Sequence, residues 1–464
     1  MKRMELLSPA GTLKAMRYAF AYGADAVYAG QPRYSLRVRE NEFNKLEVMQ
    51  QAIDEAHQLG KLFYLASNIA PHNLKVRSYL KNIEPVIAMK PDALIMSDPG
   101  LIMMVKDRWP DVPIHLSVQA NAVNFATVKF WKNFGLSRII LSRELSLNEI
   151  REIRQECSDI ELEVFVHGAL CIAYSGRCLL SGYMNHRDSN QGNCTNACRW
   201  LYQVNEAKPN LEGDYDLIAR EKAETVQDRV FLLEEPNRPG EFMPAFEDEH
   251  GTYIMNSKDL RAVQYVNELA EMGIDSIKIE GRTKSAFYVA RTAQVYHAAI
   301  DAVAREQPFD DHLMKQLDSL SNRGYTEGFY KRQPVKGLQN YEQGVSRATR
   351  QQFVGEVTEM TLLPEGNEIM LSVDVKNRFD VGDSLELMTP QGNIEFTLQT
   401  MLDGRNNKIE AAPGSPHRRN IPLRANGINW EEVGIEPDAL KRGLFLKFLQ
   451  ADALAEPDLI QLTM

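Results

Sequence analysis

Four of the five cysteines in the chain fall in one short stretch and could together bind a metal centre. Cys171, Cys178, Cys194 and Cys198 follow the spacing C-x6-C-x15-C-x3-C. Sets of four thiolates hold zinc or iron–sulfur clusters in proteins. Structural zinc sites usually contain tight C-x2-C pairs, whereas a cluster with separate iron corners accommodates uneven spacing. The pattern therefore favours an iron–sulfur cluster over zinc.

Two other interpretations of these cysteines are weaker. Free cysteine is often a buried core residue, but four of them in a polar loop rich in Gly and Asn do not resemble a core segment. Disulfides rarely persist in the cytosol, and the N-terminal MKRMELLSPAG has no apolar stretch of signal-peptide length. The fifth cysteine, Cys157, falls at the end of an expected helix away from the others, and we interpret it as structural.

Composition places the chain among ordinary globular proteins. It has 464 residues, 44% hydrophobic and 25% charged, which predicts two or three domains. The formal charge of −10 argues against a polycationic nucleic-acid coat and against binding to an anionic membrane, although a local basic face remains compatible with RNA. No run of about 18 apolar residues occurs. We expect a cytoplasmic protein with no membrane partner and infer no obligate protein partner.

The sequence pattern around the cysteines predicts an α/β fold. Apolar strand-like runs alternate with helical patterns, and residues 162–166 form the strand just before Cys171. The expected strands are residues 5–7, 24–29, 62–66, 93–96, 114–118, 138–141, 162–166 and 276–279. Eight such units favour a (β/α)8 TIM-like barrel. A doubly wound open sheet is the alternative, but no G-x-G-x-x-G follows the first strand.

Pattern changes along the chain predict the domain organisation. The barrel is expected over residues 1–307, with a cysteine-bearing insertion at 168–256 after the seventh strand and a return to helix at 258–272. Residues 308–345 read as a helical and turn-rich connector. From residue 346 to 464 short β patterns separated by turn signals predict a small antiparallel β-barrel and a tail. Because of its basic groups, such as Arg347 with Arg350 and Arg418 with Arg419, we expect it to contact RNA.

The residues around the first two cysteines resemble a known family. The run EVFVHGALCIAYSGRCLLS, residues 163–181, is similar to the signature of the collagenase-like peptidases, a family of peptidases of unknown catalytic type. Chain length and flanking motifs most resemble the members that hydroxylate uridine in tRNA, over nearly the whole chain. The resemblance implies a [4Fe–4S] cluster on the four cysteines and a tRNA substrate hydroxylated at carbon 5 of the wobble uridine, position 34. It also implies prephenate as co-substrate.

Three other functions stay open from the residues. A ribosomal-RNA hydroxylase of the same family is a near alternative. Peptidase is the historical label of the family. This sequence contains no H-E-x-x-H motif to bind a catalytic metal and no G-x-S-x-G motif to supply a nucleophile. A non-catalytic scaffold stabilised by zinc is the third possibility.

Residues that follow the strands of such a barrel line its active site. We expect His167 and Glu280 to be the catalytic candidates there, with a hydrogen-bonded supporting role as the alternative for His167. Because prephenate carries two carboxylates, the cations Arg143, Arg282, Arg37 and Lys284 are the expected binding residues.

Two of these cations have a structural alternative. Arg282 with Glu280 could be a structural ion pair, and Arg37 could lie in a solvated loop. Alternation along the last strand also predicts that Lys278 and Glu280 share a side and pair. The remaining polar residues after the strands, about half of which we expect to cap helices or turns, are Ser8, Ser67, Asn68, Ser97, Asp98, Gln119, Asn121 and Glu144.

Overall fold

The computed structural model describes most of the chain. The described residues are 2–36, 41–170, 174–178, 188–192, 258–322, 324–331, 350–363 and 368–449, together with the backbone of five short strands between residues 207 and 252.

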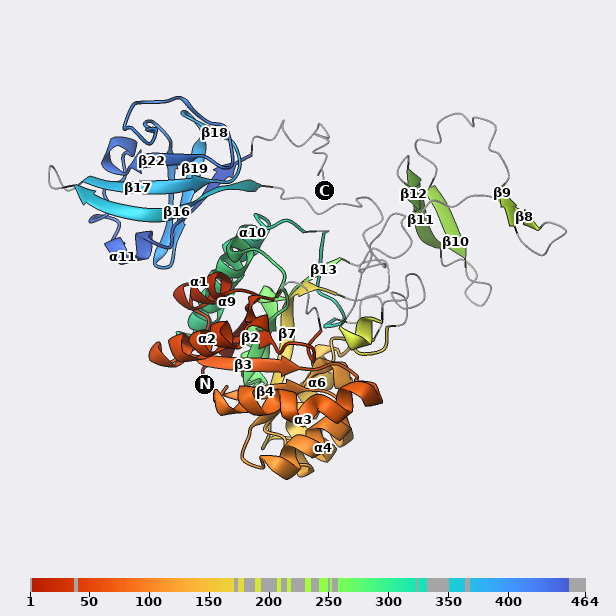
Figure 1. Ribbon diagram of the computed structural model, residues 1–464. Helices are drawn as coiled ribbons and strands as arrows, with labels where there is room; N and C mark the ends of the chain where they lie inside the picture. The colour runs from red at the N-terminus through yellow and green to blue at the C-terminus, as the bar shows by residue number, and fades with distance from the viewer. Residues whose placement is uncertain are drawn as a thin grey trace.

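Eight parallel strands close into a barrel, which confirms the predicted TIM-like fold (Figure 1). The strands are β1 Glu5–Pro9, β2 Ala26–Gly30, β3 Leu62–Ser67, β4 Ala93–Met96, β5 Ile114–Leu116, β6 Arg138–Ile140, β7 Glu161–Ala169 and β14 Ser276–Ile279. Each pairs with its neighbour in chain order, and β14 closes the ring by pairing with both β7 and β1. Strands β2 and β4 are buried along their whole length, as expected of parallel strands covered on both faces.

Helices follow the strands and surround the barrel. They are α1 Leu13–Ala21, α2 Leu46–Gln58, α3 Asn73–Ala88, α4 Pro99–Arg108, α5 Phe125–Asn133, α6 Leu147–Glu156, α8 Val266–Glu271 and α9 Ala286–Ala304. Local sequence explains where several begin. The Thr12 hydroxyl accepts a hydrogen bond from the Ala15 amide, Asp98 caps α4 in the same way, and Ser146 with Glu149 forms the expected capping box.

The expected helix over residues 258–272 is wrong in its first half. Residues Asp259–Arg261 form strand β13, which runs antiparallel to β7 and parallel to β15, Tyr325–Thr326. The edge of β7 beyond the barrel offers free backbone groups, and pairing with them outweighs the local helical pattern. Only Val266–Glu271 are α-helical. Before β13, backbone pairing joins β8 Ala207–Pro209 to β9 Tyr215–Leu217, and β10 Val230–Glu234 through β11 Phe242–Asp248 to β12 Gly251–Thr252.

The C-terminal part is an antiparallel β domain, as predicted, and we call it the β-domain. Its six-stranded sheet has the order β20 Gly392–Thr397, β19 Ser384–Thr389, β23 Leu444–Phe448, β16 Gln351–Leu363, β17 Glu368–Val375 and β22 Arg418–Pro422. A short pair, β18 Phe379–Asp380 with β21 Ala411–Ala412, lies beside it. Burial alternates residue by residue along β17, so one face covers a separate hydrophobic core.

The β-domain packs directly on the barrel helices α1 and α9. The Tyr22 hydroxyl donates to the carbonyl oxygens of Met388, at 3.0 Å, and Arg442, at 2.8 Å. Arg291 on α9 is fully buried, and its Nη2 lies 2.6 Å from Glu386 Oε1. These long-range contacts join the two cores. A buried arginine without its carboxylate partner would be costly, so the pair fixes how the two parts meet.

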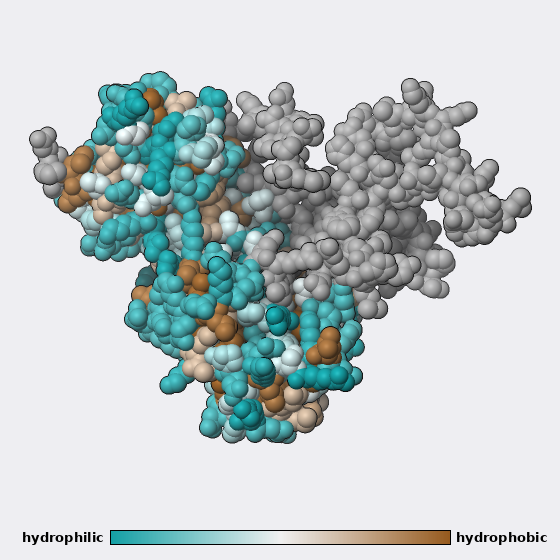
Figure 2. All heavy atoms as spheres, viewed as in Figure 1, coloured by the Kyte–Doolittle hydropathy of each residue, from teal (hydrophilic) through white to brown (hydrophobic). Residues whose placement is uncertain are grey.

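The described surface is mostly hydrophilic on the face seen in Figure 2, where apolar side chains form small separate patches. None of the helices in the described ranges is both long enough and apolar enough to cross a lipid bilayer.

Candidate active site at the barrel mouth

The carboxyl ends of β6, β7 and β14 bring two of the predicted residues together. Arg143 follows β6, Glu280 follows β14, and Arg143 Nη2 lies 3.0 Å from Glu280 Oε2. The same guanidinium donates from Nη1 to the Ala169 carbonyl oxygen at 2.9 Å and lies 4.0 Å over the Phe165 ring. Because both side chains are only 10% and 17% exposed, the pair is held rigidly at the edge of the barrel interior.

The expected pairing of Lys278 with Glu280 is wrong. Lys278 lies inside the barrel, where its Nζ is 2.9 Å from Glu163 Oε1, and its ammonium lies 4.4 Å over the Tyr28 ring. Glu280 lies just past the end of β14, where the chain turns at Gly281 with φ +145°. The strand ends between the two residues, so alternation no longer places them on one face.

Arg282 lies near the end of β2. Its Nη2 donates to the Leu36 carbonyl oxygen at 2.7 Å, and its guanidinium is 5.7 Å from the Tyr28 ring. Lys284 is exposed, with its Nζ 5.3 Å from the Tyr288 ring. The structure therefore places Arg282 and Lys284 on the turn that follows β14. Arg37 lies outside the described residues.

Three buried polar oxygens in β1 and after β2 have no hydrogen-bond partner among the described residues. They are Ser8 Oγ, Gln31 Oε1 and Ser35 Oγ. A Cβ added at Gly30 would overlap Ser35 Oγ and lie 2.7 Å from Arg282 Nη1, so Ser35 and Arg282 converge at the end of β2. Buried polar atoms normally have partners, and a cluster without them is suited to a polar ligand. The sequence analysis did not single out Gln31 and Ser35. Both follow the buried strand β2, and that position could have identified them as candidate site residues.

His167 is buried in β7 among tyrosines. Its ring centroid lies 5.8 Å from Tyr288, 5.6 Å from Tyr296 and 5.6 Å from Tyr325, and its Nδ1 is 3.4 Å from the Tyr296 hydroxyl oxygen. Burial lowers the pKa of His167 to about 3. The imidazole is therefore neutral at physiological pH, and it can orient neighbours by hydrogen bonding but carries no cationic proton to donate.

Glycine at position 168 lets the neighbouring strand ends come close. Gly168 has φ +105°, and an added Cβ would lie 2.5 Å from the Glu280 carbonyl oxygen. The Tyr288 hydroxyl donates to that same carbonyl at 2.7 Å. The backbone beside Glu280 is thus fixed from two sides, which keeps the carboxylate opposite Arg143.

Cys178 is held near the loops that follow β3 and β5. Its carbonyl oxygen accepts hydrogen bonds from Ser189 Oγ at 2.8 Å and Asn190 Nδ2 at 3.0 Å, and the Asn190 carbonyl accepts from the Ala70 amide at 3.0 Å. Gly176, with φ +77°, packs so closely on the Gln119 carbonyl that an added Cβ would overlap it. These contacts bring the half-buried Cys178 to the barrel mouth.

The other three predicted cluster ligands, Cys171, Cys194 and Cys198, lie outside the described residues. Cys171 follows Ala169, the last residue of β7, by two positions, so the chain enters the cysteine stretch at the same end of the barrel. Cys178 forms no disulfide within the described part of the chain, and cysteine sulfur is the ligand type that iron–sulfur clusters take. Cys157 lies apart at the end of α6, buried, with its Sγ 3.6 Å from the Phe125 carbonyl oxygen.

A buried ionic network below the mouth was also missed by sequence reasoning. Arg138 Nη1 lies 2.6 Å from Glu5 Oε1 and 3.1 Å from Glu163 Oε2, and Glu163 also binds Lys278. Burial would raise the pKa of Glu163, but the charges of Lys278 and Arg138 outweigh it and lower that pKa. The sequence signal that could have predicted this network is the pair of charged residues, Glu161 and Glu163, within the mostly apolar strand β7.

Comparison with known proteins identifies the class. A family model for peptidase family U32 matches residues 11–340, and the model for the C-terminal domain of that family matches residues 349–430. The chain therefore belongs to peptidase family U32.

Two relatives cover almost the whole chain. It is 60% identical over 433 residues to tRNA hydroxylation protein P of Escherichia coli (strain K12), covering 91% of this chain and 94% of that protein. The identity is also 60%, over 437 residues and with the same coverage, to tRNA hydroxylation protein P of Haemophilus influenzae. A third relative, the 23S rRNA 5-hydroxycytidine C2501 synthase of Escherichia coli (strain K12), is 30% identical over 93% of this chain but only 60% of that protein.

Proposed function

We propose that this protein is a tRNA-modifying enzyme that hydroxylates carbon 5 of the wobble uridine, position 34, in a prephenate-dependent reaction. The observation that carries the proposal is the 60% identity to two tRNA hydroxylation proteins over nearly full length. The polar mouth of the barrel supports it, because a site of this kind lies where (β/α)8 enzymes place their chemistry.

In this proposal the arginines bind the two carboxylates of prephenate. Arg143 and Arg282 lie at the ends of β6 and β14, and planar guanidinium groups bind carboxylates with paired hydrogen bonds. Glu280 holds Arg143 in position until the ligand arrives. Lys284, on the turn after β14, is a further candidate cation, and Arg37 remains a candidate from its place in the sequence. The unpartnered hydroxyls of Ser8 and Ser35 supply hydrogen bonds.

Cys171, Cys178, Cys194 and Cys198 would hold the proposed [4Fe–4S] cluster. A bound cluster supplies one-electron redox chemistry beside the substrate. The residues of this chain then have separate tasks: the arginines orient the co-substrate, neutral His167 supports the wall of the site, and Glu280 with Arg143 defines its edge.

Mass spectrometry of tRNA nucleosides tests the function. Deleting the gene should remove 5-hydroxyuridine derivatives from position 34, and the wild-type gene should restore them. The Cys157→Ala variant should restore them as well, because Cys157 lies away from the mouth. Unchanged 5-hydroxyuridine content after deletion would contradict the proposal.

A second candidate is hydroxylation of ribosomal RNA, favoured by the 30% identity to the 23S rRNA synthase. The match covers 93% of this chain and 60% of that longer protein. Digests of 23S rRNA from the same deletion strain decide between the two: loss of a hydroxylated cytidine there, with tRNA unchanged, would assign the ribosomal function.

A further inference from the structure

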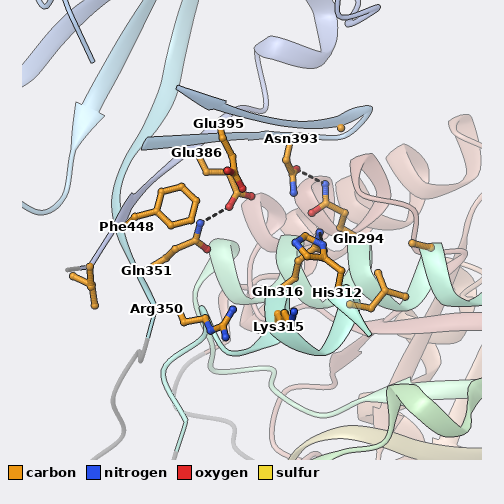
Figure 3. Close-up of a pocket in the computed structure, with 14 residues that line it drawn as sticks. Gln294, His312, Lys315, Gln316, Arg350, Gln351, Glu386, Asn393, Glu395 and Phe448 are labelled. Atoms are coloured by element: carbon orange, nitrogen blue, oxygen red, sulfur yellow. Dashed lines mark hydrogen bonds between the residues drawn. The ribbon is translucent and has the colours of Figure 1, made fainter. Parts of the chain in front are cut away.

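A pocket of about 860 Å³ lies where the barrel meets the β-domain, away from the barrel mouth. Figure 3 shows side chains from α9 and from α10, His312–Leu317, facing side chains from the β-domain. One wall carries Gln294, His312 and Gln316, and the other carries Gln351, Glu386 and Phe448. The volume falls within the range of about 300–1,000 Å³ that is usual for small-molecule sites and can hold one nucleotide.

Two cations in this pocket have no partner within the described part of the chain. Lys315 on α10 and Arg350, directly before β16, are both exposed and form no ion pair there. The pocket's buried carboxylate, Glu386, is already neutralised by Arg291 at 2.6 Å and accepts a hydrogen bond from Gln351. With Glu386 neutralised, Lys315 and Arg350 outweigh the single exposed carboxylate of Glu395, so the pocket attracts an anionic group.

The same pocket offers an aromatic ring and paired amide groups. Phe448, half-buried at the end of β23, lines it. Asn393 Oδ1 accepts from Gln294 Nε2 at 2.8 Å, which leaves the Asn393 Nδ2 donor for a ligand. Gln351 uses its Nε2 on Glu386, which leaves its Oε1 as an acceptor. An aromatic face with one donor and one acceptor matches a nucleobase, and the adjacent cations match its phosphate.

We propose that this pocket binds one unstacked nucleotide of an RNA strand, with the base against Phe448 and the phosphate at Arg350 and Lys315. The inference rests on the proposed function, because tRNA is the RNA that function requires. Barrel helices and β-domain strands form the pocket together, so a nucleotide held there fixes the RNA relative to the barrel mouth. A free mononucleotide shares this chemistry, and the experiment separates the two sources.

Binding of fluorescently labelled, unmodified tRNA transcript to the full-length protein tests the proposal. The double variant Lys315→Ala/Arg350→Ala should bind about 10-fold or more weakly at physiological salt, with a slope of log affinity against log salt shallower by about 1 to 2. Phe448→Leu keeps an apolar side chain but removes the stacking face. It should weaken binding about 5-fold or more and leave the salt slope unchanged.

A matched control removes the same charge elsewhere. Lys81 and Lys90 are exposed and lie on or after α3, on the opposite side of the barrel from the β-domain (Figure 1). Lys81→Ala/Lys90→Ala should bind tRNA like the wild type. Thermal unfolding of every variant confirms that the fold is retained, which we expect because the replaced cations are exposed.

Other outcomes would overturn either the pocket inference or the proposed function, and they can be told apart. Pocket variants that bind like the wild type, or a control that weakens binding equally, would overturn the pocket inference and leave the proposed function intact. A wild-type protein that binds no tRNA would instead overturn the proposed function. Competition with UMP and AMP separates the sources: mononucleotide binding lost in the pocket variants, with tRNA binding unchanged, would assign a free-nucleotide site and overturn RNA binding here.

Discussion

Arg143 and Glu280 form an ion pair across the barrel mouth, with 3.0 Å between guanidinium Nη2 and carboxylate Oε2, although 137 positions separate them in the sequence. Closure of the barrel through β14 and β7 brings them together. An incoming carboxylate can reach Arg143 only by competing with Glu280 or by sharing the guanidinium with it. The pair therefore links the packing of the barrel to the binding of an anionic ligand.

Arginine-to-lysine changes separate a ligand-binding role from a structural one. Arg282→Lys and Arg143→Lys each keep the positive charge but lose the planar fork, so each should raise the prephenate concentration needed for half-maximal hydroxylation by about 10-fold or more. Activity titrations with prephenate and thermal unfolding are the two measurements. A lower melting temperature with unchanged prephenate dependence would show that the arginine is structural.

The cysteines should differ sharply in their effect on iron content. Cys178→Ala removes one sulfur ligand of the proposed cluster, so it should abolish the visible absorption and bound iron that the proposal predicts for anaerobically purified protein. Cys157→Ala should retain both and cost about 1 kcal/mol of stability, since its thiol is buried beside Phe125. Stoichiometric zinc with no iron in the wild-type protein would contradict the cluster assignment.

Gly176 should control how the cysteine segment is seated. An added Cβ overlaps the Gln119 carbonyl, and the φ of +77° is strained for any L-residue. Gly176→Ala should therefore lower iron content, while far-UV circular dichroism of the barrel stays unchanged. Gly60→Ala is the matched control, because Gly60 also has positive φ, +65°, but nothing lies within 4 Å of its added Cβ. Equal iron loss in both variants would show general strain rather than displacement of the segment.

The buried carboxylate Glu163 should be essential for stability. It lies 2.9 Å from Lys278 and 3.1 Å from Arg138 and is fully buried. Arg138 keeps Glu5 as a partner, but Glu163→Gln leaves the buried Lys278 without its carboxylate and should cost about 3–5 kcal/mol. Glu161→Gln also removes a partner of Arg138, but its side chain is 41% exposed and the loss should be about 1 kcal/mol or less. Equal destabilisation in urea unfolding would contradict this difference.

The neutral state of His167 predicts acid sensitivity. Its pKa is about 3 in the folded protein and about 6.5 when unfolded, so the unfolded chain gains a proton that the folded protein does not as the pH falls below 6.5. Stability contributed by this residue is complete above pH 6.5 and lost progressively toward pH 3, by about 2 kcal/mol at pH 5. His167→Gln should show a correspondingly smaller loss of unfolding free energy between pH 7 and pH 5. Equal losses in both proteins would mean that His167 titrates normally.

Much of the fold was predictable because it depends on local pattern. Strand and helix periods gave the eight barrel units, and capping residues such as Thr12 and Ser146 gave helix starts, since each signal acts within a few positions. The helix predicted for residues 258–272 was wrong in its first half because a long-range contact overrides the local pattern there. Its pattern fits a helix, but pairing of Asp259–Arg261 with the distant β7 decides its conformation.

The sequence by itself determined which residue types stand at strand ends, the clustering of four thiols and the change to a β-domain. Only the tertiary structure decided which charges meet: Lys278 with Glu163 rather than Glu280, and Arg143 with Glu280. Alternation along a strand defines a face, but the partner on that face belongs to another strand placed by barrel closure. The pocket between α10 and β16 is likewise absent from either segment alone, because it exists only where Arg291 and Glu386 join the two cores.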